Sequence, residues 1–301
     1  MRTINTKPNP AFSKAPLKFA TRRRIEAVGH AVALCAMIVS FLSPARAETL
    51  VIPGSGNPEY ILRELARAYN SQQNQHRVIV PPTIGTAGAI REVSAETATL
   101  GRVGRPLKDK ELSLGLTYRP IGRDPVAFVG GASVTATGLS PQQAIDIFTG
   151  KITNWRDLGG KPETIRAVGR EVTDASRQTI MKEIRAFEDM KYHDGVKIVL
   201  LDTQLIELLD RYPASFGFLN RSQLSAARTD LKLLALDGVE PTADNVKEGR
   251  YKLWTELGLI YKESALTEAG RSFIAFIESP RGKELLRAHG LLLAAPDATG
   301  H

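Results

Sequence analysis

Short, mostly apolar runs alternate along the chain with segments in which apolar residues recur every three or four positions. Residues 49–52 and 77–80 have the length and composition of strands, and each is followed by a turn of small residues. After the first turn, helical spacing appears in the series Ile61, Leu62, Leu65 and Tyr69. Two strand–turn–helix units within about fifty residues are typical of a parallel α/β sheet, in which a helix connects each strand to the next.

The same alternation continues to the end of the chain. Further strands are predicted at residues 125–129, 165–168, 197–200 and 215–219. Ser140 and Pro141 predict a helix start, because serine caps, proline suits the first helical position, and Gln143 can complete a capping box. Asn57 and Asp202 are predicted as N-caps of other helices. The last two helices are predicted over residues 273–277 and 283–289.

The first 47 residues have the pattern of a secretory signal peptide. Three arginines at residues 22–24 precede an apolar stretch over residues 27–42, which is short for a membrane span. Ala45 and Ala47 then form a small-x-small cleavage site. We therefore expect residues 1–47 to be removed and the rest of the chain to be periplasmic. The arginines match a twin-arginine signal only weakly, so the choice between the two export routes stays open.

The leader also accounts for the basic charge of the chain. The whole sequence has 40 basic and 32 acidic residues and a net charge of +8, but the first 47 residues hold 8 of the basic and 1 of the acidic residues. The remaining 254 residues therefore have 32 basic and 31 acidic residues, a net charge of +1. No basic run remains after the leader, so the sequence predicts no nucleic-acid partner.

Cysteine and histidine usage argues against thiol and metal chemistry. The single cysteine, Cys35, lies in the leader after Leu34, and lipid attachment favours a small residue at that preceding position. The histidines after the leader are His76, His193, His289 and His301, and they lack metal-ligand spacing. We expect no lipid anchor, no disulfide, no metal and no cofactor.

Three loops share a composition that suits an anion. Residues 54–57, 85–88 and 173–176 each follow a predicted strand, open a predicted helix, and combine small residues with a hydroxyl. Ligands in open α/β sheets bind at the carboxyl ends of strands, where N–H and O–H donors from three such loops would hold a small anion. Taken alone, each loop is better explained as an ordinary strand-to-helix turn.

Ser55 raises the alternative of nucleophilic catalysis. A nucleophile elbow reads Gly-x-Ser-x-Gly, whereas this chain has Gly54-Ser55-Gly56, in which neither glycine has the required spacing. No histidine lies in a suggestive context either. A serine hydrolase is therefore the weakest reading, and we expect no enzyme.

Several longer segments carry a family resemblance. Residues 139–155 resemble the most recognisable segment of the phosphate-binding substrate-binding proteins of ABC importers, the PstS-like family. Residues 85–88 resemble its Gly-Ser-Ser/Ala-Gly loop, and residues 105–111 its Ser-Arg-Pro-Leu-Lys segment. Residues 213–218 and 276–282 resemble its Gly-Ala-Ile-Gly-Tyr strand and its Phe-x-x-Ser-Pro-x-Gly ending. The likeness covers almost the whole chain after the leader, and together these segments are specific.

The resemblance implies an α/β fold of the two-lobed periplasmic binding protein-like kind (type II), in which each lobe is a mostly parallel sheet flanked by helices. Lobe 1 would consist of residues 48–127 plus 220–298, and lobe 2 of residues 128–219, with two crossing strands as the hinge. The lobes would close around phosphate or a related oxyanion. The protein would act as a monomer and deliver its ligand to an ABC transporter permease in the inner membrane.

The resemblance also implies which residues contact the ligand. The charge partner would be Arg170, and Ser176 would donate through its hydroxyl and its N–H. The full set of expected ligand contacts is Ser55, Gly56, Asn57, Thr86, Ala87, Arg105, Arg170, Asp174 and Ser176.

The chain departs from the family pattern at several of these loops. Asp174 and Ala175 stand where the family has Ser and Gly, Gly104 replaces a Ser, and Pro58 and Glu59 replace Thr and a bulky apolar residue. If Asp174 faces the ligand, its ionised carboxylate would either repel a phosphate or accept a proton from monohydrogen phosphate. If it faces away from the cleft, it would simply cap the helix. The identity of the anion therefore stays open. A sensor or partner-binding protein with the same fold, not used in transport, is the alternative function.

We predict that the exported protein begins at Glu48, because cleavage after a small-x-small site removes residues 1–47. Mass spectrometry of the periplasmic protein measures this directly. An intact leader, or a lipid on Cys35, would contradict the prediction.

Overall fold

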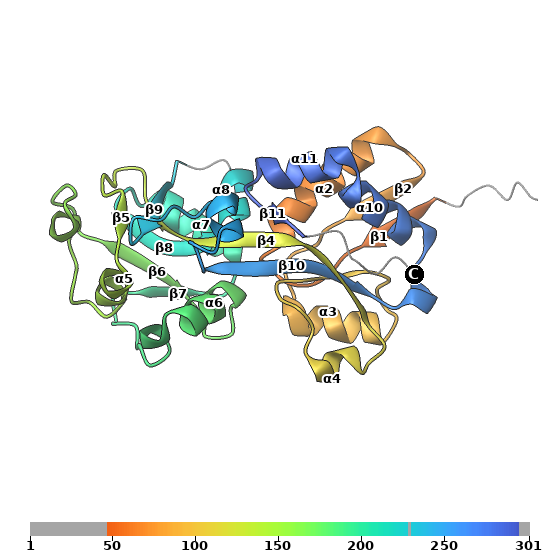
Figure 1. Ribbon diagram of the computed structural model, residues 1–301, viewed down its shortest axis with the longest axis horizontal. Coiled ribbons are helices and arrows are strands. Elements are labelled where there is room, and N and C mark those ends of the chain that lie inside the picture. The colour runs from red at the N-terminus through yellow and green to blue at the C-terminus, as the bar shows by residue number, and fades with distance from the viewer. Residues whose placement is uncertain (1–46, 228–229, 295–301) are drawn as a thin grey trace, which may run out of the picture. The chain divides into compact units, whose positions relative to one another are not determined.

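The computed structural model describes residues 47–227 and 230–294, which belong to one compact unit that begins at Ala47 (Figure 1). The predicted leader, including Cys35, lies outside the described residues. Among the described helices, none is long and apolar enough to cross a membrane.

Strands and helices alternate through most of the described chain. The strands are β1 (Glu48–Val51), β2 (His76–Ile79), β3 (Gly101–Val103), β4 (Thr117–Gly130), β5 (Gly138–Leu139), β6 (Arg166–Arg170), β7 (Lys197–Val199), β8 (Ser215–Asn220), β9 (Lys232–Leu236), β10 (Trp254–Tyr261) and β11 (Leu292–Leu293). The α-helices are α2 (Glu59–Gln72), α3 (Gly85–Ser94), α4 (Asp109–Leu112), α5 (Pro141–Phe148), α6 (Ala175–Glu183), α7 (Asp202–Arg211), α8 (Arg221–Ala227), α9 (Ala243–Lys247), α10 (Glu268–Glu278) and α11 (Pro280–Ala288). Short 3-10 turns occur at Trp155–Leu158, Arg185–Phe187 and Glu263–Ala265.

The buried apolar residues form separate cores, which define two lobes. In lobe 1, helices α2, α10 and α11 pack with β1 and β2 around residues such as Leu62 and Phe273, and α3 packs on β3. In lobe 2, α5 and α6 pack with β6 and β8 around Phe148, Phe216 and Phe218, while α7 covers the other side of these strands. The two-lobed α/β fold predicted from the sequence is therefore confirmed.

Two long strands, β4 and β10, run between the lobes (Figure 1). They pair antiparallel from Thr117↔Tyr261 to Pro125↔Trp254, with a register shift at Leu257/Gly258. Strand β4 also pairs antiparallel with β8 and β9, whereas β6 pairs parallel with both β7 and β8. The sheet is thus mixed and not mostly parallel, because a strand that returns to the first lobe must run against the strand that left it.

The core of lobe 2 includes residues that the sequence-based boundary places in lobe 1. Leu234 of β9, Val246 of α9 and Tyr251 are buried in the same apolar cluster as Phe128 and Phe216. Strand β9 pairs with β4 and β5, so the chain adds another strand to lobe 2 before β10 leaves it. We therefore propose that lobe 2 extends to about residue 253 instead of ending at residue 219.

Two of the three predicted helix caps differ in the structure. Ser140 caps α5 with a full capping box, as predicted. Helix α2, however, is preceded by Pro58 without a side-chain cap, and Asn57 is one residue too early to cap it. Asp202 is the first helical residue of α7, and its side chain makes no capping bond. Both side chains instead lie at the candidate site described below, where long-range contacts outweigh the local capping preference.

The turn after β1 has a backbone that only glycine suits. Gly54 has a φ of +143° and forms a parallel bridge with Arg102 of β3. A Cβ added at Gly54 would lie 2.0 Å from the carbonyl oxygen of Arg102. The absence of a side chain therefore allows the 54–57 loop to lie against β3.

We predict that Gly54→Ala lowers the free energy of unfolding by about 3 kcal/mol or more, since it adds a backbone clash to an unfavourable φ. Gly159→Ala is the matched control, because Gly159 has a φ of +76° but no atom within 4 Å of the added Cβ, so its cost should be only about 1 kcal/mol. Urea denaturation of both variants measures the difference. Equal losses would contradict the role assigned to the close approach of Gly54 to Arg102.

Candidate functional site

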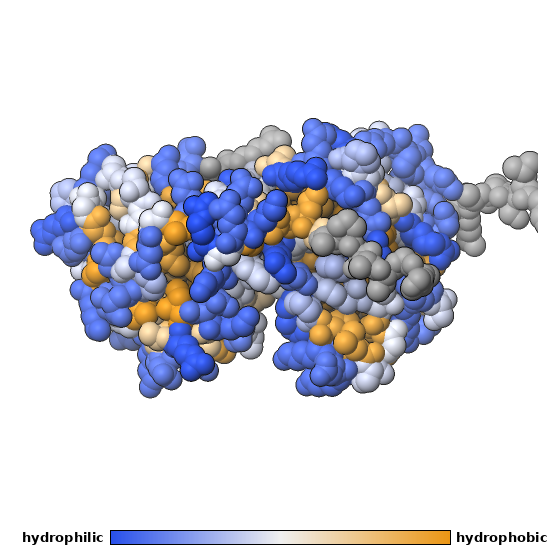
Figure 2. Space-filling view, viewed as in Figure 1, coloured by the Kyte–Doolittle hydropathy of each residue, from blue (hydrophilic) through white to orange (hydrophobic). Residues whose placement is uncertain are grey.

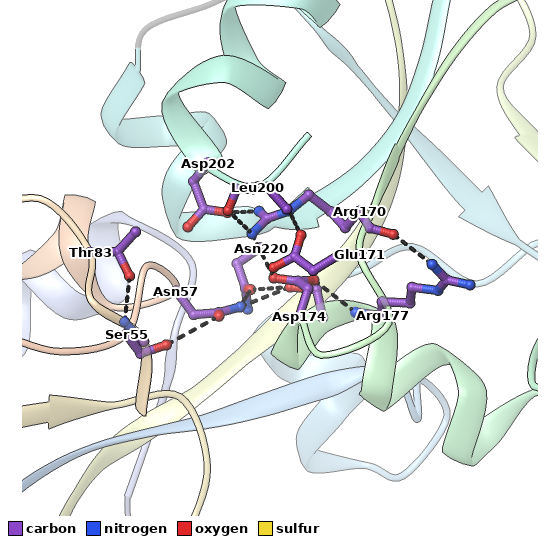
Figure 3. A network of polar contacts seen from close by, with 12 residues as sticks. Ser55, Asn57, Thr83, Arg170, Glu171, Asp174, Arg177, Leu200, Asp202 and Asn220 are labelled. Carbon is purple, nitrogen blue, oxygen red and sulfur yellow. Dashed lines mark hydrogen bonds and ion pairs between the residues drawn. The ribbon is translucent and has the colours of Figure 1, made fainter. Parts of the chain in front are cut away.

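Arg170, the last residue of β6, is the centre of a buried polar cluster (Figure 3). The residue is only 5% exposed, yet its guanidinium contacts three carboxylates. Nη2 lies 3.0 Å from Oδ2 of Asp174, Nε lies 3.4 Å from Oε2 of Glu171, and Nη1 pairs with Oδ1 of Asp202. Nη2 also donates to the carbonyl oxygen of Leu200 at 3.1 Å.

These contacts use most of the donor capacity of Arg170. A guanidinium has five N–H donors and no acceptor. The three carboxylates and the Leu200 carbonyl oxygen are four acceptors, which leave one N–H for any other group. An incoming oxyanion can therefore form a bidentate pair with Arg170 only if one of these acceptors moves away.

Asp174 caps helix α6, as the sequence predicts, and also pairs with Arg170. Its Oδ1 accepts a hydrogen bond from the backbone N–H of Arg177 at 2.9 Å, and its Oδ2 faces Arg170. The residue is 6% exposed, and both of its oxygens are used within lobe 2. Of the roles that the sequence leaves open for Asp174, the structure therefore favours the helix cap.

Burial and the charges around Arg170 shift the pKa values of Arg170 and of Asp174. Burial alone would lower the pKa of Arg170, but the carboxylates of Asp202, Asp174 and Glu171 outweigh it and raise the pKa above its ordinary value. Burial raises the pKa of Asp174 to about 6, against the opposing effect of Arg170 and with a further increase from Asp202. Both pKa values can be raised together because the single cation, Arg170, is shared by three carboxylates that repel one another.

A second set of contacts joins the two lobes. Nδ2 of Asn57 in lobe 1 donates to Oγ of Ser176 in lobe 2 at 2.8 Å and also to Oδ1 of Asn220 (Figure 3). Oγ of Ser176 donates to the same Asn220 oxygen at 2.8 Å, and Oγ of Ser55 lies 3.4 Å from Oδ1 of Asn57. These four residues are buried, so neutral amide and hydroxyl groups of both lobes meet in one network.

Asn220 connects this network to the crossing strands. Its Nδ2 donates to Oγ1 of Thr255 in β10 at 2.6 Å and to the carbonyl oxygen of Asp124 in β4 at 3.2 Å. The Asp124 carboxylate in turn accepts bonds from the N–H and the hydroxyl of Ser222. Burial raises the pKa of Asp124 to about 7, although the bonds from Ser222 oppose the shift. The position of Asn220 is therefore fixed by both strands that join the lobes.

On the lobe 1 side, Arg102 holds the 54–57 loop in place. Its guanidinium is fully buried and donates to the carbonyl oxygens of Ser55 at 2.8 Å and Pro81 at 2.8 Å. Nη2 also lies 3.2 Å from Oε2 of Glu59, which forms a second ion pair with Arg63 at 2.8 Å. Burial lowers the pKa of Arg102 to about 10, although Glu59 opposes the shift. The contacts of Arg102 therefore fix the 54–57 loop without the help of a ligand.

The structure brings together most of the predicted ligand contacts, but not all. Ser55, Asn57 and Ser176 meet in the interlobe network, next to the cluster of Arg170 and Asp174.

Arg105 lies apart from this network. Its Nη1 and Nη2 each lie 2.8 Å from an oxygen of Glu111 in α4, so its charge is used within lobe 1. Ala87 is exposed in the first turn of α3. Thr86 is nearer the 54–57 loop, since its Oγ1 lies 3.5 Å from the backbone N–H of Gly104.

Two glycines allow the surrounding groups to approach closely. A Cβ at Gly104 would lie 2.9 Å from Oγ of Ser55 and 3.3 Å from Oδ1 of Asn57, so the serine expected from the family resemblance would not fit here without a shift. A Cβ at Gly56 would lie 2.0 Å from Oδ2 of Asp202. Lobe 1 backbone therefore lies directly against a carboxylate of lobe 2.

The sequence does not reveal Asp202 and Asn220 as site residues. For Asp202 a signal exists, since it follows β7 at the same edge of the sheet at which Arg170 ends β6. No comparable signal exists for Asn220, because its partner Asn57 is 163 positions away.

The junction between the lobes contains donor groups of the kind that recognise a small oxyanion. Among the described residues, no group of three or more His, Cys, Asp or Glu side chains could hold a metal ion. The groups that face the junction between the lobes include a buried guanidinium, hydroxyls and amides, which are donors that recognise an oxyanion, together with the carboxylate of Asp202. In the space-filling view, a hollow opens between the part of lobe 2 with α6 and the part of lobe 1 with α3 and α4 (Figure 2).

We predict that Asp174 gives the protein a measurable pH dependence of stability. Its pKa is about 6 in the folded chain, above the ordinary aspartate value of 3.8 that applies to the unfolded chain, so the folded state binds a proton more readily. The stability from this group is therefore greatest at low pH and falls as the pH rises from about 4 to about 6. The charged groups that face it are Arg170, Asp202 and Glu171.

Asp174→Asn keeps a capping oxygen and removes the titration. The free energy of unfolding of the unmodified protein should fall relative to this variant over the same pH range, as measured by urea denaturation. Asp210→Asn on the exposed side of α7 is the control and should follow the unmodified protein. Parallel pH profiles for all three proteins would show that Asp174 does not titrate in this range.

Known proteins resemble this chain along most of its length. The PBP superfamily domain matches residues 40–281. The phosphate-binding protein PstS of Bacillus subtilis is 27% identical over 238 residues, which cover 77% of this chain and 75% of that protein. PstS of Borreliella burgdorferi is 21% identical over 247 residues, covering 80% and 88%.

Solved structures give the same result. A Clostridium perfringens protein, crystallised with bound phosphate and described as a candidate substrate-binding protein of a phosphate ABC transporter, matches with a TM-score of 0.70 and 28% identity, covering 82% of this chain and 100% of that one. An ABC-type phosphate transport receptor from Vibrio cholerae matches with a TM-score of 0.59 and 23% identity, covering 81% and 100%, which supports the fold. The two lobes, the crossing strands and the family match over most of the sequence show that this chain belongs to the PBP superfamily.

Proposed function

We propose that this protein captures phosphate or a related oxyanion between its lobes and delivers it to an ABC importer. The observation that carries the proposal is the buried guanidinium of Arg170. Only the carboxylate of Asp202 lies between this guanidinium and the lobe 1 backbone at Gly56. The Asn57–Ser176–Asn220 network beside it contributes hydroxyl and amide donors from both lobes. A buried cation surrounded by such donors is suited to bind a small oxygen-rich anion.

The relatives support the same function. PstS proteins of two species and a phosphate-bound structure share the fold over most of their length with this chain. The partners expected on this basis are the anion and a permease in the inner membrane, and the protein would act as a periplasmic monomer. A binding protein of this family captures a solute without chemical change, so we propose no catalytic residue.

A sensor or partner-binding role is the second candidate. It is favoured by the four acceptors on Arg170, which leave the guanidinium little capacity for a ligand and would weaken capture. The fold does not decide between the candidates, since a LysR family transcriptional regulator also matches, with a TM-score of 0.51 and 12% identity.

A thermal-shift screen of the exported protein against phosphate, sulfate, molybdate and small organic acids tests the proposal. A ligand that binds only the folded state raises the melting temperature, and the increase grows with the logarithm of the ratio of ligand concentration to Kd. We expect phosphate or another tetrahedral oxyanion to give the largest increase. A screen in which no oxyanion raises the melting temperature would contradict oxyanion capture.

We predict that Arg170→Ala weakens oxyanion binding far more than Arg166→Ala. Loss of a charge-assisted contact should cost about 1.5–3 kcal/mol, or roughly ten- to a hundredfold in affinity. Arg166 is a suitable control because it lies at the other end of β6, is exposed, and stacks over the ring of Tyr212 at 5.1 Å.

Calorimetric titration with phosphate compares the two variants, and Arg170→Lys tests whether a point charge can replace the guanidinium. Melting temperatures measured alongside show whether each variant is folded. Equal affinities for Arg170→Ala and Arg166→Ala would remove Arg170 from the binding site.

A further inference from the structure

Asp202 is placed differently from the other two carboxylates on Arg170. It is the first residue of α7 in lobe 2, is 6% exposed, and pairs with Arg170 through Oδ1. Its Oδ2 is buried and has no hydrogen-bond partner among the described residues. This second oxygen faces the 54–57 loop, since a Cβ on Gly56 would lie 2.0 Å from it (Figure 3).

The carboxylate of Asp202 therefore lies between the guanidinium of lobe 2 and the backbone of lobe 1. An oxyanion held by Arg170 and the 54–57 loop would present one oxygen to each of them. Asp202 already presents its two oxygens in this way, with Oδ1 on Arg170 and Oδ2 toward Gly56. In its geometry and its charge, it takes the place that such an anion would take.

Asp202 is also the carboxylate that would lose the fewest other contacts by turning away from Arg170. Asp174 would lose its cap on α6 together with its ion pair if it turned away. Glu171 contacts Arg170 at a longer distance, 3.4 Å, and its side chain is 27% exposed, so its departure would not open the junction with lobe 1. Asp202 makes no capping bond, and its Oδ2 gains nothing in hydrogen bonding from being buried.

We propose that Asp202 is an internal counter-ion and the specificity-determining residue of this site. An oxyanion binds by exchange, in which the Asp202 side chain turns away from Arg170 and the ligand takes its place against Gly56. This inference rests on the proposed function, which it refines by defining the class of ligand.

The exchange favours one chemical class over another. Asp202 is tethered beside Arg170, so it competes at an effective concentration on the order of millimolar or higher. A monocarboxylate such as acetate offers Arg170 the same group as Asp202 and gains little by replacing it. A tetrahedral oxyanion has additional oxygens that can replace Asn220 Oδ1 and Ser176 Oγ as acceptors of the bonds that Asn57 and Ser176 now donate, and, as a dianion, a larger charge. The site therefore selects tetrahedral oxyanions over carboxylates.

Asp202→Asn tests the exchange, because it keeps the size of the side chain and removes the competing charge. Calorimetric titrations with phosphate, sulfate and acetate are performed at one pH and one ionic strength. Removing a like charge at contact distance should tighten phosphate and sulfate binding by about tenfold or more. Acetate binding should become measurable in this variant alone.

Two further variants serve as controls. Asp210→Asn makes the same change of charge on the exposed side of α7 and should leave every affinity unchanged. Glu171→Gln removes another carboxylate from Arg170 and should give a smaller gain than Asp202→Asn. An equal gain from Glu171→Gln would overturn the exchange, because the effect would then depend only on the net charge of the cluster.

Other results separate the failure of this inference from the failure of the proposed function. If the unmodified protein binds phosphate and Asp202→Asn binds it equally or less tightly, Asp202 only positions Arg170 and the inference alone fails. If neither protein binds any oxyanion, both fail. If the Asp202→Asn variant binds phosphate and the unmodified protein does not, the inference is supported.

Asp202→Ser is used in place of the Asn variant if the latter does not fold. A crystal structure of the unmodified protein grown with phosphate gives an independent readout. Asp202 turned away from Arg170 supports the exchange, and phosphate bound beside an unchanged Arg170–Asp202 pair overturns it.

Discussion

The burial of the Arg170 guanidinium is the constraint on which the rest of the candidate site depends. A cation at this depth is stable only if anions and acceptors replace the water that it loses, and here Asp174, Asp202, Glu171 and the Leu200 carbonyl oxygen do so. Each of these groups follows β6 or β7 at the same edge of the sheet. The requirement to neutralise one side chain therefore determines how the loops of lobe 2 are arranged where they meet lobe 1.

Charged and neutral groups have separate tasks at the junction of the lobes. The ion pairs lie within a lobe: Arg170 with its carboxylates in lobe 2, and Arg102 with Glu59 in lobe 1. Where the 54–57 loop meets lobe 2, the direct side-chain bonds from Asn57 to Ser176 and Asn220 are made by neutral groups. Neutral hydrogen bonds are individually weak and can be remade at little cost, which would suit the proposed capture of a ligand between the lobes.

The sequence predicts the two lobes, the helix beginning at Ser140 and the importance of the loop after β6, because these depend on local patterns and on a family resemblance. The sequence-based prediction is wrong where a residue type suits a local role, such as a helix cap, but the side chain contacts residues that are distant in the sequence. Asn57 and Asp202 look like helix caps, yet contacts with residues 32 to 163 positions away determine their placement. Arg105 shows the opposite relation, since the sequence suggests a ligand contact and the structure pairs its guanidinium with Glu111, six positions away. Local patterns cannot rank such competing partners, because the ranking depends on which surfaces the fold brings together.

The affinity of such a site for an oxyanion depends on a difference in free energy between two pairings of Arg170, one with its own carboxylates and one with the ligand. The strength of either pairing alone does not determine the affinity. Arg170 is already paired with its own carboxylates, so the net free energy of the proposed capture depends on what those carboxylates lose when they are displaced. Asp174 would lose a helix cap, whereas Asp202 would lose only the pairing of one oxygen. Substitutions that change the alternative partners of Arg170 will therefore alter affinity and selectivity even when the guanidinium and the surrounding fold remain the same.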